Sequence, residues 1–389
     1  MELTWSDAEE AFRTECRAWL RANVPSEGLG SGDTAAGFAR HLEWERLLHE
    51  ARWAVVSWPE AYGGRDASIW EWLIFEEEYY AAGAPQRITQ NGIFLLAPTI
   101  FEFGAQAQQD HYLPRMSAAQ DLWCQGWSEP NAGSDLAGIA SKAVRDDDAG
   151  GWRLSGQKTW TTRGAFCTHL FGLFRSDPAS ERHRGLTYFL VPLDAEGMTV
   201  RGFGRLDGDE GFAEVFLDEV FVPDDDGTPD TKRRGGILGG VDEGWGVAMA
   251  TTSSERGLTL RSPGRFRAAA ARLVDLAGER GETATDSVLD SVTEAWIDAE
   301  AYALYTLADV TDLSEGRPGG AKSSYNKVFW SEMDLRLQRT ALDLLGPEAE
   351  LDGAWMKGYE FALSGPIYAG TNEIQRNIIA ERVLGLPRK

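Results

Sequence analysis

The chain opens with a pattern that predicts a capped amphipathic helix. Ser6-Asp7-Ala8-Glu9 has the form of a capping box, in which a hydroxyl and a carboxylate three residues apart satisfy backbone N–H groups where a helix begins. Apolar residues then recur at steps of four, four and three, which is the spacing of one helix face, at Ala8, Phe12, Cys16 and Trp19. We therefore expect the first element to be a helix that buries this face.

Helical spacing continues through the first third of the chain. It is carried by the segments 38–53, 69–82 and about 91–119, and the turn-rich sequence WPEAYGGRD at 58–66 separates the first of these from the second. These patterns predict an N-terminal α-helical domain over residues 1–121.

The pattern becomes strand-like near Asp121. From 122 to 223, short runs of apolar and β-branched residues alternate with Gly, Asp, Ser and Pro. The clearest runs are WRLSGQKTWTT, HLFGLFRS, LTYFLVPLD and FAEVFLDEVFVP. They predict a middle domain of antiparallel β-strands over residues 122–226.

Helical patterns return after the polar, turn-rich segment 224–236. Long periodic segments lie at about 244–262, 264–280, 286–314 and 320–345. A last helix is expected to begin at Thr371 or Asn372, since either is a good N-cap, with Glu373 in its first turn. The pattern predicts a C-terminal α-helical domain over 227–389, and thus an α+β fold with a β domain between two helical domains.

Composition narrows the possible functions. The 389 residues include 61 acids and 38 bases, a formal net charge of -23, which argues against a nucleic-acid partner because such binding needs Lys and Arg to neutralise phosphates. No stretch approaches the roughly 18 uninterrupted apolar residues of a membrane-spanning helix, and the first twenty residues carry five acids. We expect neither a signal peptide nor a membrane anchor.

Cysteine and histidine usage favours a metal-free protein of the cytoplasm. Cys16, Cys124 and Cys167 are too few and too scattered for a disulfide framework or a thiolate metal site, so a reducing compartment is expected. We expect all three to be small buried side chains. No two of the five histidines have the i, i+4 spacing of a metal-binding helix face, and we expect no metal site.

Two segments are suited to a planar polar cofactor. The stretch 123–135 places Gly and hydroxyl residues beside two tryptophans, so that backbone N–H groups and a ring face can approach a ligand closely. In the segment 157–162, QKTWTT, one aromatic residue lies among hydroxyls that could bond a ring edge. From these residues alone, a cofactor site and an ordinary β-domain core with exposed turns are equally good interpretations.

Five segments, in order, resemble the acyl-CoA dehydrogenases. The similar segments are WPEAYGG at 58–64, GWSEPNAGSD at 126–135, GQKTWTT at 156–162, GWGVAMATTSSERG at 244–257 and IYAGTNEIQRNIIAERVLGLPR at 367–388. The resemblance implies an acyl-CoA dehydrogenase-like fold with a C-terminal four-helix bundle. It also implies an enzyme that removes hydrogens from the α and β carbons of an acyl thioester.

The resemblance further implies an FAD buried between the β domain and the C-terminal helices. Trp127 and Ser128 match positions on the isoalloxazine ring, and Ser134 matches one near the pyrophosphate or the thioester. The other matching cofactor positions are Trp160, Thr161, Thr162, Thr371 and Glu373.

The catalytic base departs from the commonest family pattern. Many members place it after the Tyr of Tyr-Glu-Gly-Thr, where this chain has Tyr368-Ala369-Gly370-Thr371, and alanine cannot act as a base. A second family solution, a Glu immediately before an Arg on the central helix, matches Glu255-Arg256. The resemblance implies that Glu255 takes the α proton while the β hydrogen leaves as hydride to flavin N5. The alternative is a structural Glu255–Arg256 ion pair.

Substrate contacts are implied for Ser134, Arg256, Tyr368 and Ala369. In the family a backbone N–H at the position of Ala369 and a ribityl hydroxyl hold the thioester carbonyl, and the backbone donor survives the loss of the Glu side chain. Arg163 replaces a small polar residue common in the family. It is a further candidate for contact with an anionic carrier, either CoA or acyl-carrier protein.

Two further departures concern assembly. The stretch Asp343-Leu344-Leu345-Gly346-Pro347 stands where the family's Gln-x-x-Gly-Gly helps to hold FAD in a neighbouring subunit, and Arg265 and Arg267 match a family Arg by position only. Both changes are seen in relatives that form mixed tetramers of active and cofactor-poor chains. A homo-oligomer and a mixed tetramer with a related chain are both expected possibilities.

The main hypothesis is therefore a cytoplasmic FAD enzyme of fatty acid or lipid metabolism. It would convert an acyl-CoA to the trans-2-enoyl-CoA and pass electrons to an electron-transfer flavoprotein. Two alternatives stay open: a catalytically silent subunit of a heteromeric dehydrogenase, and a flavin oxidase or desaturase that acts on a carrier-protein-bound acyl group.

Overall fold

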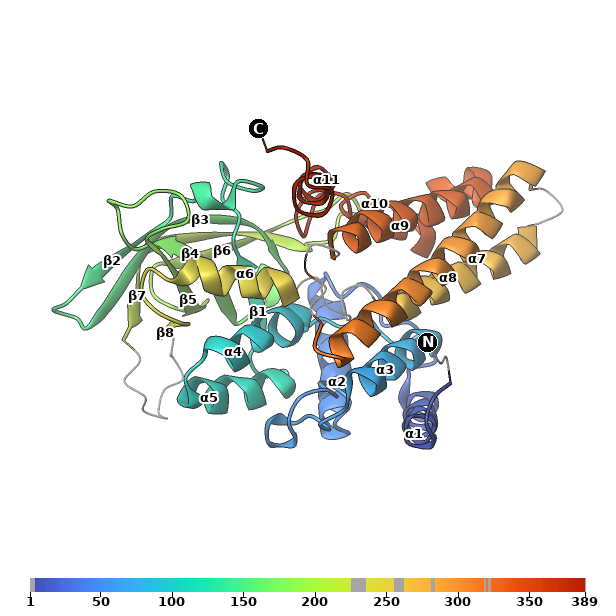
Figure 1. Ribbon diagram of the computed structural model, residues 1–389, viewed down its shortest axis with the longest axis horizontal. Helices are drawn as coiled ribbons and strands as arrows, with labels where there is room; N and C mark the ends of the chain where they lie inside the picture. Colours follow the sequence, from blue (N-terminus) through green and yellow to red (C-terminus); the bar gives the residue numbers. More distant parts are fainter. Residues whose placement is uncertain are drawn as a thin grey trace. The chain divides into compact units, whose positions relative to one another are not determined.

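The computed structural model describes residues 4–224, 236–254, 262–280, 284–317, 320 and 323–388. The chain divides into two compact units (Figure 1). The helical unit comprises Met1–Ser26, Ala67–Ala84 and Leu258–Lys389, and the sheet unit comprises Glu27–Asp66 and Pro85–Gly257. The domain boundaries expected at 121 and 226 stay predictions.

Over its described residues, the sheet unit contains one eight-stranded sheet, in the order β6-β7-β3-β2-β4-β5-β8, with β1 paired to β4 off this path. Most pairs are antiparallel, as predicted, but β1 and β2 each pair with β4 in parallel. The strands are β1 (Trp123–Gly126), β2 (Lys142–Asp146), β3 (Gly151–Thr162), β4 (His169–Arg175), β5 (Leu186–Pro192), β6 (Met198–Phe203), β7 (Phe212–Pro223) and β8 (Gly236–Ile237).

The sheet core follows from the hydrophobic pattern of its strands. β5, LTYFLVP, is buried at every residue, as a continuous apolar run predicts for a strand covered on both faces. Leu154 of β3, Leu170 of β4 and Val215 of β7 are fully buried in one cluster with Phe189 of β5. This cluster fixes β3, the strand that carries the predicted cofactor positions Trp160–Thr162.

The sheet unit also contains several helices, of which α6, η2 and η4 pack against its strands. The predicted helix 91–119 is divided, because Gly104 adopts an extended conformation (ψ 137°) that ends α4. α6 packs against β5, since a Cβ at Gly244 would come within 2.7 Å of the β5 backbone. These elements are α2 (Ala35–Glu50), η1 (Glu60–Tyr62), η2 (Asn91–Leu96), α4 (Ala97–Phe103), α5 (Gln106–Ser117), η3 (Leu136–Gly138), η4 (Gly164–Phe166) and α6 (Gly244–Ser254).

The helical unit begins with the predicted capping box. Ser6 Oγ accepts from the Glu9 N–H at 3.3 Å, and the Ser6 N–H donates to the Glu9 carboxylate at 2.7 Å. The buried face of α1 differs by one turn from the prediction, because it consists of Phe12, Cys16 and Leu20. Ala8 is exposed and Trp19 half-buried, so the buried face starts one turn after the cap.

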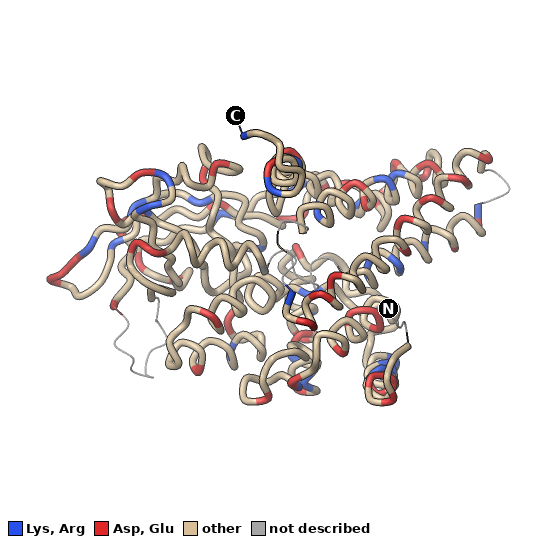
Figure 2. The backbone as a smooth tube through the Cα atoms, viewed as in Figure 1, with Lys and Arg blue, Asp and Glu red and all other residues tan. Residues whose placement is uncertain are grey.

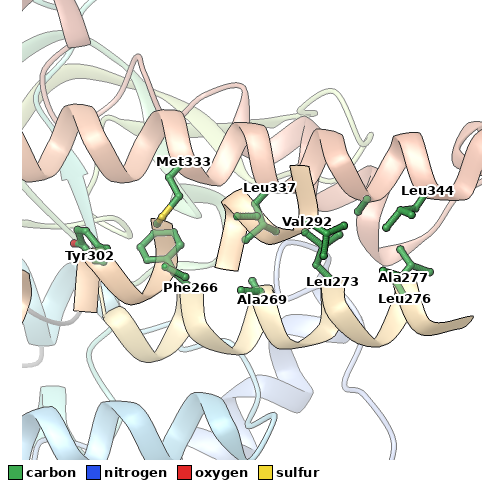
Figure 3. Close-up of a cluster of buried hydrophobic side chains, with 14 of the residues drawn as sticks. Phe266, Ala269, Leu273, Leu276, Ala277, Val292, Tyr302, Met333, Leu337 and Leu344 are labelled. Carbon is green, nitrogen blue, oxygen red and sulfur yellow. The ribbon is translucent and has the colours of Figure 1, made fainter. Parts of the chain in front are cut away.

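Three long helices form the core of this unit. Phe266 and Leu273 of α7, Val292 of α8, and Met333 and Leu337 of α9 meet in one buried cluster (Figure 3). Their spacing matches the predicted helical period. The elements are α1 (Asp7–Asn23), α3 (Ile69–Ala81), α7 (Pro263–Arg280), α8 (Asp286–Ser314), α9 (Ser323–Leu345), η7 (Gly346–Glu350), α10 (Ala354–Ala362), α11 (Asn372–Ile378) and η8 (Ile379–Val383).

The three cysteines do not share one environment. Cys16 and Cys124 are buried as predicted, whereas Cys167 is half-buried. The expectation was wrong for Cys167 because it lies between η4 and β4 and not within a strand of the core.

Charged residues lie on the helices, strands and loops of both units (Figure 2). Among the described residues, no group of three or more His, Cys, Asp and Glu side chains is arranged to hold a metal ion. No helix in this part of the chain is both long and apolar enough to cross a bilayer.

Candidate active site

The structure brings together the two sheet-unit segments that were predicted to contact a cofactor. The N–H of Thr159 in β3 donates to the carbonyl of Ser128 at 2.9 Å. Ser128 follows β1 by two residues, so this bond fastens the loop after β1 to the end of β3. Trp127, Ser128 and the segment 160–162 therefore belong to one local arrangement.

Trp160 is unusually exposed for a tryptophan in a strand. The pairing of β3 with β7 shifts register between Lys158 and Thr161, and Trp160 has a φ of +58°. Such a bulge changes the face toward which a side chain points. The ring is 61% exposed and packs edge-on against Phe203 and Phe212, at 5.3 and 5.6 Å. These two phenylalanines support an aromatic surface that is open to a ligand.

Two buried polar atoms of these two segments have unused hydrogen-bonding capacity. Among the described residues, neither Trp127 Nε1 nor Thr161 Oγ1 has a partner. Buried polar groups almost always have one, so both atoms indicate a ligand or water. Ser128 and Thr162 are half-buried and also carry hydroxyls. A planar ring with polar edges fits this group of residues, and FAD has such a ring.

A buried ion pair holds the loop after β1. Glu129 accepts from Lys158 Nζ at 2.8 Å and from the N–H groups of Ala140 and Ser141 at 2.7 and 3.0 Å. Lys158 is fully buried and also donates to the Leu173 carbonyl at 2.7 Å. Burial alone would raise the pKa of Glu129, but the Lys158 ammonium and these hydrogen bonds lower it. The Glu129 carboxylate therefore stays charged.

Ser134, the predicted pyrophosphate or thioester contact, is exposed on the same loop. Its neighbour Asp135 accepts two hydrogen bonds from Arg182, at 2.7 and 2.8 Å. Arg182 belongs to the loop 179–184, which lines an open surface cavity of about 490 Å³.

The loop 179–184 was missed by the sequence reasoning. It contains Arg182, His183 and Arg184 in succession, and His183 packs on the Trp245 ring at 4.3 Å. Arg175 supports it by donating to the carbonyls of Ser180, Arg182 and Arg184. The signal was the basic run RHR, whose proximity to Ser134 only the fold reveals.

Arg163, in contrast, does not face solvent. The expectation that it contacts an anionic carrier is wrong, because its side chain is 5% exposed and its Nε bonds the Asp33 carboxylate at 2.6 Å. Asp33 also pairs with Arg205 at 2.6 Å. Arg163 therefore joins the loop before α2 to the end of β3.

The C-terminal site segment forms a left-handed turn in the helical unit. Ala369 and Gly370 have φ values of +55° and +76°. Thr371 is the N-cap of α11, as predicted, and its hydroxyl accepts from the Ile374 N–H at 3.3 Å. Tyr368 is 38% exposed and lies 5.8 Å from the Trp330 ring. The turn and the N-cap therefore fix the backbone from Ala369 to Thr371.

Glu373 is exposed in the first turn of α11. Its own backbone N–H and the Thr371 hydroxyl lower its pKa. Two positions predicted to lie near the cofactor, Thr371 and Glu373, therefore lie together at the N-terminus of α11.

The arginines that matched a family position are already paired. Arg265 bonds Asp334 at 2.7 Å; burial opposes its charge, but Asp334 and Tyr368 raise its pKa. Arg267 pairs with Glu300 at 2.7 Å and Glu77 at 3.2 Å. Asp343 is exposed near the end of α9.

The predicted base and its neighbour, Glu255 and Arg256, lie outside the described residues. α6 is described to Ser254, so the helix that precedes them is defined. Thr251 anchors this helix through bonds to Thr99 at 2.9 Å and Tyr188 at 3.3 Å.

Comparisons with known proteins agree with this architecture. Three family models match in succession: acyl-CoA dehydrogenase N-terminal domain at 6–120, middle domain at 124–220 and C-terminal domain at 242–384. Acyl-CoA dehydrogenase IpdE1 of Mycobacterium tuberculosis is 38% identical over 98% of this chain and 99% of its own length. IpdE1 of Mycolicibacterium smegmatis is 36% identical over 98% of each chain.

Solved structures match over the whole length. The Tcur3481-Tcur3483 steroid ACAD has a TM-score of 0.85 at 24% identity, covering 100% of both chains. The ChsE4-ChsE5 complex from Mycobacterium tuberculosis has a TM-score of 0.81 at 27% identity, again covering 100% of both. On the sequence relatives and the family models together, this chain belongs to the acyl-CoA dehydrogenase family of FAD-dependent oxidoreductases.

Proposed function

We propose that this chain dehydrogenates an acyl thioester between its α and β carbons, with FAD as its cofactor and Glu255 as its base. The observation that carries most weight is the local group formed by Trp127, Ser128 and 160–162. It combines an exposed aromatic surface with two buried polar atoms that have no partner in the described chain. Such a group suits a planar ring with polar edges.

The residues that would hold FAD are Trp127, Ser128, Trp160, Thr161 and Thr162, with Ser134, Thr371 and Glu373 as further contacts. When bound, FAD supplies the acceptor for the β hydrogen as hydride.

Glu255 is proposed to remove the α proton for two reasons. The α proton of a thioester is weakly acidic, so its removal needs a positioned carboxylate and hydrogen-bond donors for the carbonyl oxygen. Ala369 has no carboxylate to offer, whereas Glu255 precedes an Arg as in the second family pattern. A desolvated position would raise the pKa of Glu255 toward the working pH.

The backbone N–H of Ala369 is proposed to donate a hydrogen bond to the carbonyl oxygen of the thioester. Within the described chain, the N–H of Ala369 donates to no acceptor. The phosphates of CoA are proposed to meet the basic loop 179–184. Arg182 bonds Asp135, the neighbour of the exposed Ser134, and Arg184 lines the cavity of the same loop. Arg256 and Tyr368 complete the proposed substrate contacts.

The test is anaerobic reduction of the bound flavin by a panel of acyl-CoA thioesters that includes steroid-derived ones. The steroid members are included because one structural relative is described as a steroid ACAD. We expect the visible flavin band to bleach in the wild type and to persist in Glu255→Gln with its FAD retained. Glu243→Gln, which removes an exposed carboxylate just before α6, is the control and should bleach normally. Equal bleaching in Glu255→Gln would exclude this base.

The electron acceptor is proposed to be an electron-transfer flavoprotein. Substrate-reduced enzyme should be reoxidised faster by that protein than by air. Rapid peroxide formation in air would instead support an oxidase.

A silent subunit of a mixed assembly is the second candidate. It is favoured by Ala369 and Asp343, which depart from the family pattern, and by the two-component names of the solved relatives. A chain that purifies without FAD, and that bleaches no flavin until a related chain is added, would support it. One FAD per chain with substrate-dependent bleaching would exclude it.

A further inference from the structure

We propose that Gln375 is a positioning residue that orients the free backbone N–H groups of the Ala369–Gly370 turn toward the thioester carbonyl. The inference rests on the proposed function, in which Ala369 supplies a donor to that carbonyl. It concerns a side chain of α11 that no motif assigned to the site.

Gln375 is fully buried and reaches back to the turn. Its Nε2 donates to the carbonyl of Ala369 at 3.1 Å and to that of Gly370 at 3.4 Å. Both residues have positive φ, a conformation that is costly for alanine because Cβ approaches the following carbonyl. A Cβ at Gly370 would lie 2.6 Å from Gln375 Nε2, so the amide fits closely beneath the turn. Gln375 thus stabilises a strained backbone at the proposed site.

Holding each carbonyl directs the N–H of the residue that follows it, and holding both fixes the turn that carries the Ala369 N–H. The described chain contains no cis peptide bond, so the Ala369 carbonyl and the Gly370 N–H of the same peptide point in opposite directions. Because the Ala369 carbonyl accepts from the buried Gln375 Nε2, the Gly370 N–H of this peptide points away from Gln375. The N–H groups of Ala369 and Gly370 donate to no acceptor in the described chain. Successive free N–H groups in such a turn favour a negatively charged oxygen.

The rest of α11 is anchored without Gln375. Asn372 Oδ1 accepts from Lys327 Nζ at 2.8 Å and from Ser331 Oγ at 3.1 Å, both on α9. The Asn372 N–H donates to the Pro366 carbonyl at 2.8 Å. Loss of the Gln375 amide should therefore release the turn while α11 stays in place. Gln375 Oε1 has no partner in the described chain, so the amide's two assigned bonds are those to the turn.

The experiment uses FAD-loaded enzyme and 4-(dimethylamino)cinnamoyl-CoA, whose absorption moves to the red when its carbonyl accepts hydrogen bonds. Gln375→Met keeps the side-chain length and removes the donor. We expect it to keep its FAD, to lose most of the red shift, and to reduce flavin about 10- to 100-fold more slowly with little change in KM. Misdirected donors should cost less than the complete loss of one oxyanion donor, which slows enzymes by about 10²–10³-fold.

Gln108→Met is the matched control. Gln108 is also a buried glutamine that bonds backbone groups, with its Nε2 donating to the Ile237 carbonyl at 2.9 Å, but it lies on α5 of the sheet unit. It should lose stability without losing the red shift. An unchanged red shift and rate in folded Gln375→Met would overturn the proposal and leave Gln375 a purely structural residue.

Gln375→Glu keeps the proposal testable if the Met variant does not fold. A carboxylate cannot donate to the two carbonyls, whereas the protonated acid can, and burial raises a carboxyl pKa. The red shift should therefore be weak near pH 8 and recover toward pH 6, and a pH-independent shift would contradict the inference. If wild type neither shifts the probe nor bleaches with any thioester, the proposed function itself fails. If wild type does both, the variants test Gln375 alone.

Discussion

At the scale of single residues, backbone conformation decides which predicted side chains are available to a ligand. Trp160 and Arg163 lie three residues apart and both have positive φ, +58° and +53°. One side chain is 61% exposed and the other is buried on Asp33. The bulge in β3 changes the side toward which Trp160 points, and the Asp33 carboxylate fixes Arg163.

Trp160 should contribute to FAD affinity more than to folding. Trp160→Ala removes an exposed aromatic surface, so we expect the FAD dissociation constant of the apoprotein to rise about tenfold, or ~1.4 kcal/mol. Flavin fluorescence titration measures it. Leu206→Ala, which truncates another exposed apolar residue of the sheet unit (72% exposed), should leave the constant unchanged. Equal affinities in both variants would remove Trp160 from the cofactor site.

At the scale of elements, one buried ion pair connects the loop after β1 to β3. Lys158 lies in β3 with none of its side chain exposed, and Glu129 lies in the loop with 7% exposed. Trp127, Ser128 and 160–162, the proposed cofactor contacts of the sheet unit, all lie within four positions of one of the two. Loss of the Lys158–Glu129 ion pair should therefore disturb the proposed cofactor contacts and also lower the stability of the sheet unit.

Lys158→Met should destabilise the sheet unit by about 3–5 kcal/mol, because it leaves the Glu129 carboxylate buried without its counter-charge. Lys158→Met/Glu129→Gln should recover part of this loss. Urea unfolding measures both. Arg182→Met breaks an exposed pair, with side chains 57% and 58% exposed, and should change stability little because solvent screens such a pair. A loss in Lys158→Met no larger than that of Arg182→Met would show that the buried pair is not structural.

At the scale of the whole molecule, stability should depend on pH through two histidines of the sheet unit. Burial lowers the pKa of both His49 and His169. Their unfolded pKa is about 6.5, so the unfolded chain binds protons first as the pH falls. The part of the free energy of unfolding that requires neutral His49 and His169 rings is fully present above about pH 6.5. It is lost progressively as the pH falls below that value.

The melting temperature should therefore fall between pH 7.5 and 5.5 in the wild type. Scanning calorimetry of His49→Gln/His169→Gln should show a smaller fall over the same range. His183→Gln, which replaces an exposed histidine, serves as the control and should follow the wild type. Identical pH dependence in all three proteins would assign the acid sensitivity to other groups.

The sequence determined the features that depend on local chemistry. The capping box at Ser6, the N-cap at Thr371 and the buried run of β5 were predictable because neighbouring residues make the deciding contacts. The family resemblance implied cofactor contacts for Trp127, Ser128 and 160–162, which the bond between the Thr159 N–H and the Ser128 carbonyl brings into one local group. Their contact with FAD stays a prediction.

Only the tertiary structure decided contacts between residues far apart in the chain. Asp33 neutralises Arg163 across 130 positions, so a cation that looked available for the carrier is buried. The loop 179–184 brings bases beside Asp135, and its run RHR carries no sign of that neighbour. Gln375 lies beneath Ala369 because α11 folds back on the turn before it. Burial and pairing depend on such contacts, and no local pattern encodes them.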